Sequence, residues 1–236
     1  MILHKLIEDI FIIEGIPAII IKSQKILVLG DIHVGLEQKY LNAGIILNGA
    51  SQIMAAKILS LCNEFHVSKV LFLGDLKESI SYPEKNEYDL LVNFINTLNM
   101  EILIAKGNHD GHLEELLQRI GRTDVIIKKE IILGKYSFIH GHSLPTKECL
   151  LSDIIFAAHG HFAVYDGDKI NKVFVLSSNL KKRTNPKFLL LLPAFNQLIG
   201  GTSLNSITKK RVPFLNHKMF EWSGSCVFSI EGKKIG

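Results

Sequence analysis

Side chains that can bind metal ions recur in this chain where apolar runs end. Asp31 and His33 follow the run "KILVL" at 25–29, and Asp75 follows "KVLFL" at 69–73. Three more segments close later runs, namely "GNHD" at 107–110 and "HGH" at both 140–142 and 159–161. Carboxylates, imidazoles and amide oxygens together suit divalent ions such as Mn²⁺, Fe²⁺ or Zn²⁺. The pattern therefore indicates metal-dependent chemistry.

Each segment alone also has an ordinary structural interpretation. Asp31 suits a turn or a helix N-cap, Asp75 suits a turn, and Asp110 suits the N-cap of a helix that begins near residue 111. A single loop histidine is commonly satisfied by backbone groups. The set favours the metal interpretation, because the carboxyl ends of neighbouring strands in an open sheet meet where ligands bind.

The elements that must position these residues follow from the apolar pattern. Short runs closed by glycine predict strands covered on both faces, at 25–30, 69–75 and 101–110. Apolar residues at helical spacing predict helices over 49–65 and 87–98. This alternation is typical of βαβ units with right-handed crossovers.

The pattern changes after residue 123. Strand-like runs follow one another, and beyond 111–121 this half has no helical segment of comparable quality. The runs are "DVIIKKEIILGKYSFIHGH", "DIIFAAHGH", "KVFVLSS", "KFLLLLPAF" and "SCVFSIEG". We expect a second sheet, mixed or antiparallel, packed on the first with helices outside. The fold class is thus α/β (α+β), with two β-sheets flanked by helices.

Composition agrees with one domain over residues 1–236. The chain is 47% hydrophobic and has no linker-like tract or fixed repeat. Its three cysteines, Cys62, Cys149 and Cys226, are far apart, which suggests a reducing compartment. Charged residues interrupt the N-terminal segment, and no apolar run approaches the ~20 residues of a membrane span. We therefore expect a cytoplasmic protein.

The net charge of +4 is concentrated late in the chain. "KKR" at 181–183, followed by Lys187, and "KKR" at 209–211 hold much of the excess. Such clusters either contact phosphates or nucleic acid or form solvated loops, and both interpretations stay open.

The segments "GDIH", "GDLKE", "GNHD", "HGH" and "HGH", in this order, resemble the five motifs of the calcineurin-like metallophosphoesterase superfamily. With "GDIHVGLE", "AHGHFAV" and "LLLLPAFNQLIGG", the chain looks like the archaeal ICC-like phosphoesterases, which are similar to ligase-associated DNA damage response endonucleases. The resemblance runs from about residue 18 to the C-terminus. It implies a four-layer αββα sandwich with a dinuclear metal site at one edge.

The resemblance also implies roles for individual residues. Asp31, His33 and His161 would bind the first metal, Asn108, His140 and His159 the second, and Asp75 would bridge both. His109 would contact the phosphate, together with Asn108, and protonate the leaving oxygen. Asp110 would orient His109, and His142 would lie behind the ligands.

The chain departs from the family pattern at two places. Ala158 stands where a glycine is usual, which changes backbone freedom but no ligand. Leu76, Lys77 and Glu78 replace the Asp-Arg continuation of the protein phosphatases, which disfavours that activity. Lys77 then either supplies positive charge beside the phosphate or faces solvent. The segment "PAFNQLIGG" suits a structural bend that closes the second sheet.

The resemblance implies a metal-dependent phosphoesterase that hydrolyses phosphodiester or phosphomonoester bonds with a hydroxide bridging two divalent ions. Manganese is the first expectation, with iron, zinc, nickel or magnesium as alternatives. The expected substrate is a phosphate ester such as DNA, RNA or a nucleotide, without membrane association, and the protein a monomer or homodimer. The alternative is a catalytically silent scaffold of this fold that binds a protein partner. That alternative requires lost ligands, and here all seven ligand positions are filled.

Overall fold

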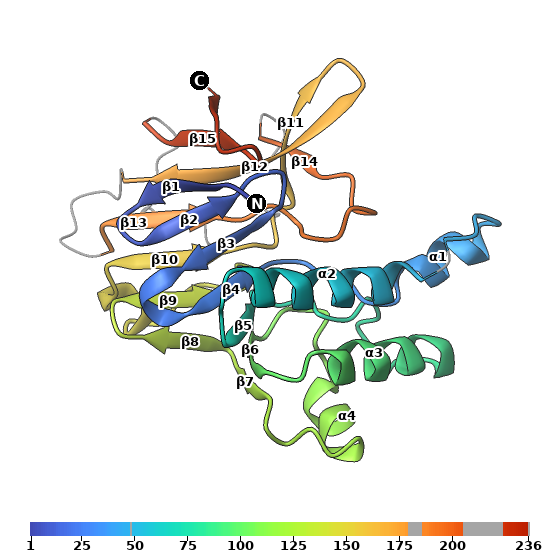
Figure 1. The fold of residues 1–236 in the computed structure, drawn as a ribbon. Helices are drawn as coiled ribbons and strands as arrows, with labels where there is room; N and C mark the ends of the chain where they lie inside the picture. The colour runs from blue at the N-terminus through green and yellow to red at the C-terminus, as the bar shows by residue number, and fades with distance from the viewer. Residues whose placement is uncertain (48, 179–185, 205–223, 236) are drawn as a thin grey trace.

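The computed structural model describes residues 1–47, 49–178, 186–204 and 224–235. Two mixed β-sheets pack on each other, and the described α-helices gather on one side of them (Figure 1). These helices are α1 (Leu36–Asn42), α2 (Ala50–Glu64), α3 (Lys85–Thr97) and α4 (Leu113–Arg119). The expected α/β fold of two sheets with helices outside is confirmed, with the described α-helices covering the first sheet only.

The first sheet keeps the order of the chain. Its strands are β1 (Leu3–Ile7), β2 (Ile10–Ile13), β3 (Ala18–Ile21), β4 (Ile26–Leu29), β5 (Lys69–Phe72), β6 (Glu101–Ala105) and β7 (Ile126–Lys128). Strands β1 to β4 pair antiparallel, and β4 to β7 pair parallel. The three predicted strands are confirmed as β4, β5 and β6. The N-terminal strands, for which the sequence gives no assignment, extend the sheet on the β4 side.

Strand β7 corrects the expectation that every run after residue 123 joins the second sheet. It pairs parallel with β6, and Ile126 lies opposite Leu103. Helix α4 supplies the crossover that brings the chain back in the same direction, as a parallel pair requires. The predicted helix 111–121 thus serves the first sheet.

The second sheet is mixed. Along the sheet its strands run β14 (Thr202–Ser203), β11 (Phe162–Asp166), β12 (Lys169–Ser177), β13 (Phe188–Leu191), β10 (Ile154–Ala157), β9 (Tyr136–Ile139) and β8 (Glu130–Leu133). Strand β15 (Cys226–Ser229) pairs with β12 and with β16 (Lys234–Ile235). At the centre, β10 pairs parallel with both β9 and β13.

The central strands read as unbroken apolar runs because both of their faces are buried. In β4, Ile26 and Val28 face the core between the sheets, whereas Leu27 and Leu29 face the helices. Phe138, on β9 of the second sheet, belongs to the same inter-sheet core as Ile26 and Val28. This is the alternation of period two expected of a strand.

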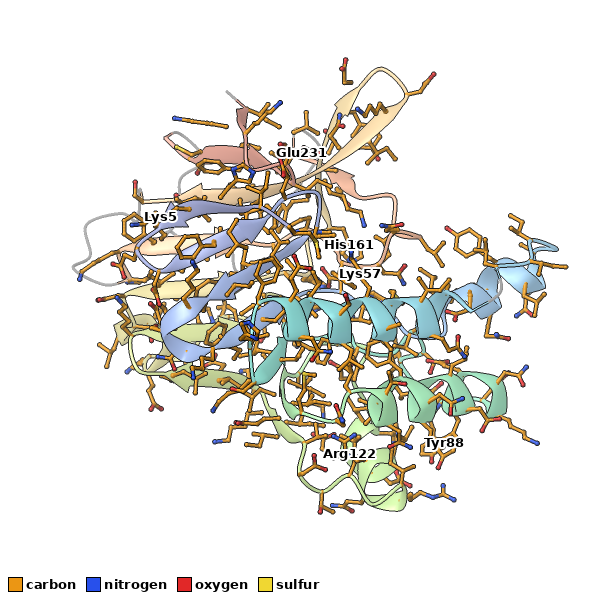
Figure 2. The ribbon with its side chains drawn as sticks, viewed as in Figure 1. Lys5, Lys57, Tyr88, Arg122, His161 and Glu231 are labelled. Atoms are coloured by element: carbon orange, nitrogen blue, oxygen red, sulfur yellow. The ribbon has the colours of Figure 1, made fainter. Side chains whose placement is uncertain are left out.

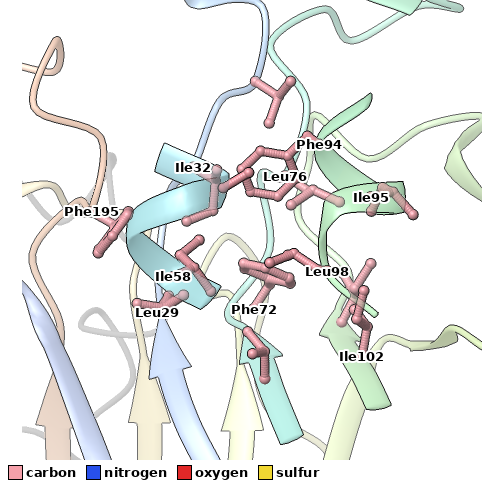
Figure 3. Close-up of a cluster of buried hydrophobic side chains, with 14 of the residues drawn as sticks. Leu29, Ile32, Ile58, Phe72, Leu76, Phe94, Ile95, Leu98, Ile102 and Phe195 are labelled. Carbon is pink, nitrogen blue, oxygen red and sulfur yellow. The ribbon is translucent and has the colours of Figure 1, made fainter. Parts of the chain in front are cut away.

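The helices cover the outer face of the first sheet. The predicted helices 49–65 and 87–98 are confirmed as α2 and α3, which pack Ile58 and Phe94 onto Phe72 of β5 (Figure 3). Helix α1 was not anticipated, because its seven residues are too few to show a period. None of the described helices combines the length and apolar character needed to cross a membrane.

The outer face of the second sheet is also apolar. Ile155, Val175 and Leu189 form a separate cluster there with Cys149, which lies in the 3₁₀ turn η2 (Cys149–Leu151). Within the described ranges this face has no α-helix. A short 3₁₀ turn, η1 (Lys22–Gln24), links β3 to β4.

Truncating Phe72 tests the helix-facing core. Phe72 is fully buried, and its ring lies 6.2 Å from that of Phe94. We expect Phe72→Ala to lower the free energy of unfolding by about 3–5 kcal/mol, because it leaves a cavity between β5 and the helices. Ile53→Ala on α2, where the side chain is 66% exposed, is the control and should stay within about 0.5 kcal/mol. Equal losses in urea denaturation of both variants would contradict this assignment of the core.

Candidate metal centre

The loops after five strands meet at one edge of the two-sheet sandwich. Parallel pairing brings the ends of β4, β5 and β6 together in the first sheet, and the ends of β9 and β10 in the second. Nδ1 of His140 lies 2.6 Å from the carbonyl oxygen of Leu73, across the two sheets. Gly30 leaves the space that the methyl group of Ala158 occupies, since a Cβ on Gly30 would lie 2.6 Å from it. Ala158, which stands where the resembled family usually has a glycine, thus fits because Gly30 opposite it has no side chain.

Asp31, His33 and His161 form one group of side chains. Their ligand atoms all lie within 4.8 Å of one another, with 3.6 Å between Nε2 of His161 and Oδ1 of Asp31. Asp31 is fully buried and His33 nearly so. Oδ1 of Asp31 and Nε2 of His33 have no hydrogen-bond partner among the described residues. Buried polar atoms of this kind are costly unless a ligand completes them, so the group fits a cation.

Asp75, His140 and His159 form a second group of the same size. Nε2 of His140 lies 3.1 Å from Oδ2 of Asp75 and 2.9 Å from Nδ1 of His159. The amide oxygen of Asn108 is 3.2 Å from the same nitrogen. Because Nδ1–H of His140 donates to Leu73, its Nε2 faces these three side chains.

Asp75 lies between the two groups. Its Oδ2 is 3.7 Å from Nε2 of His33, and its Oδ1 accepts the backbone N–H of His109 at 2.9 Å. The structure therefore brings together all seven side chains that the sequence predicts as ligands, from loops of both sheets.

The electrostatics of the centre follow from charges buried close together. Burial by itself raises the pKa of Asp75, but the hydrogen bond and charge of His140 and the N–H of His109 outweigh it, so the net shift is downward. Burial lowers the pKa of His140, but Asp75 raises it more. Burial and the charge of His140 lower the pKa of His159 to about 4. His159 is thus neutral near pH 7, as a metal ligand must be.

Five of the candidate ligands have left-handed backbone conformations. The φ angles are 52° at Asp31, 47° at His33, 51° at Asp75, 66° at His159 and 46° at His161. Each such non-glycine residue costs on the order of 1–3 kcal/mol unless its surroundings compensate. The strain coincides with the positions whose side chains converge.

Two glycines allow the loops after β5 and β6 to approach. A Cβ on Gly107 would lie 2.2 Å from Oδ1 of Asp75, and one on Gly74 would lie 2.7 Å from backbone atoms of Gly107. Any larger residue at Gly107 must displace the carboxylate that joins the two groups.

Glu78 is a site residue that the sequence analysis missed. Its Oε2 lies 2.7 Å from Nδ1 of His33, its Oε1 accepts a hydrogen bond from Lys39, and its carbonyl oxygen accepts one from Nδ1 of His109. These contacts leave Nε2 of both histidines free. The available signal was an acidic residue three positions after Asp75.

Lys77 meets neither expectation. It is fully buried, and its ammonium group donates to the carbonyl oxygens of Ser79 and Ser81. It therefore neither faces solvent nor projects toward a phosphate. It stabilises the turn after Glu78 instead.

Asp110 acts on the backbone of these loops rather than on the ring of His109. Its Oδ2 accepts the N–H groups of Asp75 at 2.9 Å and Gly107 at 2.7 Å, and its Oδ1 accepts that of Leu76 at 2.8 Å. It does not cap α4 either, because the N-cap residue of that helix is His112. Asp110 fixes the two loops in register.

His142 lies beside the second group, with its ring 5.3 Å from that of His140. It does not belong to any of the ligand groups within the described chain.

The "PAFNQL" segment, expected to form a structural bend, also holds the loop that carries Asp31 and His33. The backbone N–H of Phe195 donates to Gly30, and the side chain of Asn196 donates to the carbonyl oxygen of Ile32 at 2.8 Å. Half-buried Lys172 on β12 donates in turn to the carbonyl oxygens of Ala194 and Asn196.

The basic clusters at 181–183 and 209–211 lie outside the described residues. Lys187 is described, and it pairs with Asp153 at 3.1 Å.

Comparisons with known proteins agree with this architecture. The family model described as "Calcineurin-like phosphoesterase" matches residues 24–193. The crystal structure of nuclease MPE from Pseudomonas putida is similar over 97% of both chains, with a TM-score of 0.66 and 18% sequence identity, which supports the fold. The phosphoesterase Yfce from E. coli covers 89% of this chain and 96% of its own, at 12% identity, but its TM-score of 0.41 is too low to carry an argument. No curated protein sequence matches significantly.

Substituting Gly107 tests the close approach of the two loops. We expect Gly107→Ala to lower the free energy of unfolding by about 1–3 kcal/mol and to weaken divalent-metal binding, because its methyl group displaces Asp75. Gly200→Ala is the matched control, since the nearest atom to its Cβ would be 3.6 Å away. Urea denaturation and titration calorimetry with Mn²⁺ measure both effects. If Gly107→Ala binds metal as tightly as the wild type, metal binding does not depend on this position of Asp75.

Proposed function

The chain belongs to the calcineurin-like phosphoesterase family, and from that premise we propose that it hydrolyses phosphate esters with two divalent metal ions. The observation that carries the proposal is the pair of buried ligand groups joined by Asp75. A single ion would not need ligands from five strand ends. Two ions held by one bridging carboxylate are a recurring arrangement in phosphoester hydrolysis.

We assign Asp31, His33 and His161 to the first ion, Asn108, His140 and His159 to the second, and Asp75 to both. The unpartnered buried atoms of Asp31 and His33 support the first assignment. The convergence of Asn108 and His159 on His140 supports the second. Nitrogen and oxygen ligands without sulfur favour manganese, and they also suit iron, zinc, nickel or magnesium.

The bound ions would supply positive charge at the phosphate and lower the pKa of a coordinated water. The chain supplies the remaining groups. The backbone N–H of His109 donates to Asp75 and its Nδ1–H to the carbonyl oxygen of Glu78, so its Nε2 is unpaired by these contacts. When both ring nitrogens carry a proton, Nε2 would give one to the leaving oxygen. His109 is half-buried and Asn108 exposed, which suits both for contact with the substrate. Asp110 supports His109 indirectly, through the backbone of its loop.

Within this activity we propose a phosphodiester of nucleic acid as the substrate, and membership of the archaeal ICC-like branch. The printed name of the Pseudomonas putida structure, a nuclease, supports the substrate class, and the late basic clusters agree with it. No observation favours the silent scaffold, because every proposed ligand position holds a competent side chain.

We further propose that residues 1–236 form one domain. Strands β1 to β3, which lie before the matched region, belong to the first sheet. The backbone of Gly15 also donates to Ile230, near the other end of the chain. Contacts of this kind are expected within one domain.

Metal analysis joined to hydrolysis assays tests the proposal. We expect two ions per chain and hydrolysis of bis-p-nitrophenyl phosphate, p-nitrophenyl phosphate or single-stranded DNA with Mn²⁺, Ni²⁺, Zn²⁺ or Mg²⁺. Asp75→Asn should lower metal affinity and abolish turnover. Absence of hydrolysis with every metal, despite two bound ions, would favour the scaffold.

Replacing His109 separates proton donation from metal binding. We expect His109→Ala to keep both ions and to lose about 10²–10⁴-fold in kcat on substrates with alkoxide leaving groups, because these need protonation. Esters of p-nitrophenol should lose less, since p-nitrophenolate leaves without a proton. His66→Ala, at an exposed histidine before β5, is the control and should match the wild type. Loss of both ions from His109→Ala would instead make His109 a ligand.

A further inference from the structure

A group of aromatic and cationic side chains lies outside the metal centre and has no role in the chemistry described above. Tyr82 and Tyr88 stack with ring centroids 6.4 Å apart and an angle of 22° between their planes. The ring of His112 meets the edge of Tyr82 at 6.1 Å. Arg119 donates to the hydroxyl of Tyr82 at 2.9 Å, with its guanidinium 5.8 Å from the ring centroid. We call these four residues the Tyr82 platform.

The Tyr82 platform is accessible. Both tyrosines are half-buried, whereas His112 and Arg119 are exposed. Tyr88 lies on α3, on the helical side of the molecule, where Figure 2 labels it. Large aromatic rings held by neighbours in fixed positions lose little entropy when they bind a planar ligand.

Two adjacent segments, residues 78–82 and 109–112, lead from the metal centre to the platform. They touch at Glu78 and His109, where the ring of His109 donates to the carbonyl oxygen of Glu78. They touch again at Gly111 and Ile80, since a Cβ on Gly111 would lie 2.8 Å from the carbonyl oxygen of Ile80. They end at the platform, where Tyr82 meets His112.

The length of this path sets the size of the ligand. Tyr82 stands four positions after Glu78, which corresponds to at most about 14 Å of extended chain. The side chain of Ile80 is 64% exposed along the way and offers apolar surface to a sugar or base. A ligand that spans both places must extend beyond the phosphate group that reacts.

Charge around the platform favours a neutral ring over a phosphate. Glu84 and Asp89 are exposed close to the tyrosines in sequence, and Glu115 lies 3.4 Å from the ring nitrogen of His112. These carboxylates disfavour a phosphate directly on the rings, while exposed Lys85 and Arg119 add positive charge nearby. Stacking on tyrosine and contact with an arginine instead suit the face of a nucleobase, whatever its sequence.

We propose that the Tyr82 platform stacks an unpaired base of a nucleic-acid strand whose neighbouring phosphate lies at the metal centre. This inference rests on the proposed function, which it deepens by naming a binding site for the strand. In this arrangement the base belongs to a nucleotide next to the reacting phosphate, and the substrate is a single-stranded segment.

Binding without hydrolysis tests the proposal independently of activity. Fluorescence anisotropy of a fluorescein-labelled oligothymidylate with phosphorothioate linkages, which resist hydrolysis, is measured with Mn²⁺ present. Tyr82→Ala should weaken binding about tenfold or more, as expected for loss of one stacked base. Tyr82→Phe keeps the ring and should stay within about threefold of the wild type. Binding of thymidine monophosphate, which cannot span the path, should not change.

Two further variants guard against a folding defect and a general charge effect. Arg119→Ala, at an exposed position, should weaken binding of the oligothymidylate. Lys69→Ala removes a cation at the start of β5, whereas the metal centre follows the end of that strand. It should leave binding unchanged. With metal present, Tyr82→Ala should lower kcat/KM for the oligothymidylate but not for bis-p-nitrophenyl phosphate.

The outcomes for the platform and for the proposed function differ. Equal binding by Tyr82→Ala and wild type, or a loss that appears only with thymidine monophosphate, would overturn the platform. Wild-type protein that binds the strand through Tyr82 but hydrolyses no ester with any metal would overturn the proposed function and leave the platform in place.

Discussion

The carboxylate of Asp75 joins the two sheets of the molecule electrostatically. One oxygen accepts a backbone N–H from the loop after β6, and the other faces His140 from the second sheet. A buried carboxylate is costly unless it is paired, so these contacts have to be made together. The packing of the inter-sheet core sets the distance between the loops, and that distance decides whether Asp75 is satisfied.

Several devices keep the loops around this carboxylate in place. Asp110 binds three backbone N–H groups, Glu78 holds His33 and His109, and Asn196 holds the carbonyl oxygen of Ile32. All three act behind the converging side chains. They offset the cost of left-handed backbone at the ligand positions, which an isolated loop would relieve by rotating.

The sequence predicted those parts of the structure that depend on local pattern. Strands β4, β5 and β6 were predictable because burial on both faces makes their runs uniformly apolar, and the strand ends then located the converging residues. The contacts of Lys77, Glu78 and Asp110 were not predictable in this way. Asp110 accepts the backbone N–H of Asp75, 35 positions away, and the carbonyl oxygen of Glu78 meets His109, 31 positions away, so these contacts are decided by the tertiary fold. Lys77 donates to the carbonyl oxygens of Ser79 and Ser81, which only the turn after Glu78 brings to its ammonium group. Strand β7 was misplaced because its short run carries no mark of its sheet.

The bond from Asn196 to Ile32 links residues 164 positions apart, and this separation orders events during synthesis. A nascent chain that has produced Asp31, His33 and Asp75 has most of the first sheet but lacks the support of its first loop. Closing so long a loop carries an entropic cost that the packing of the second sheet has to offset. The support from Asn196 is therefore available only after strand β13 has been synthesised. Before His159 and His161 are made, the early motif residues are only part of the candidate ligand set.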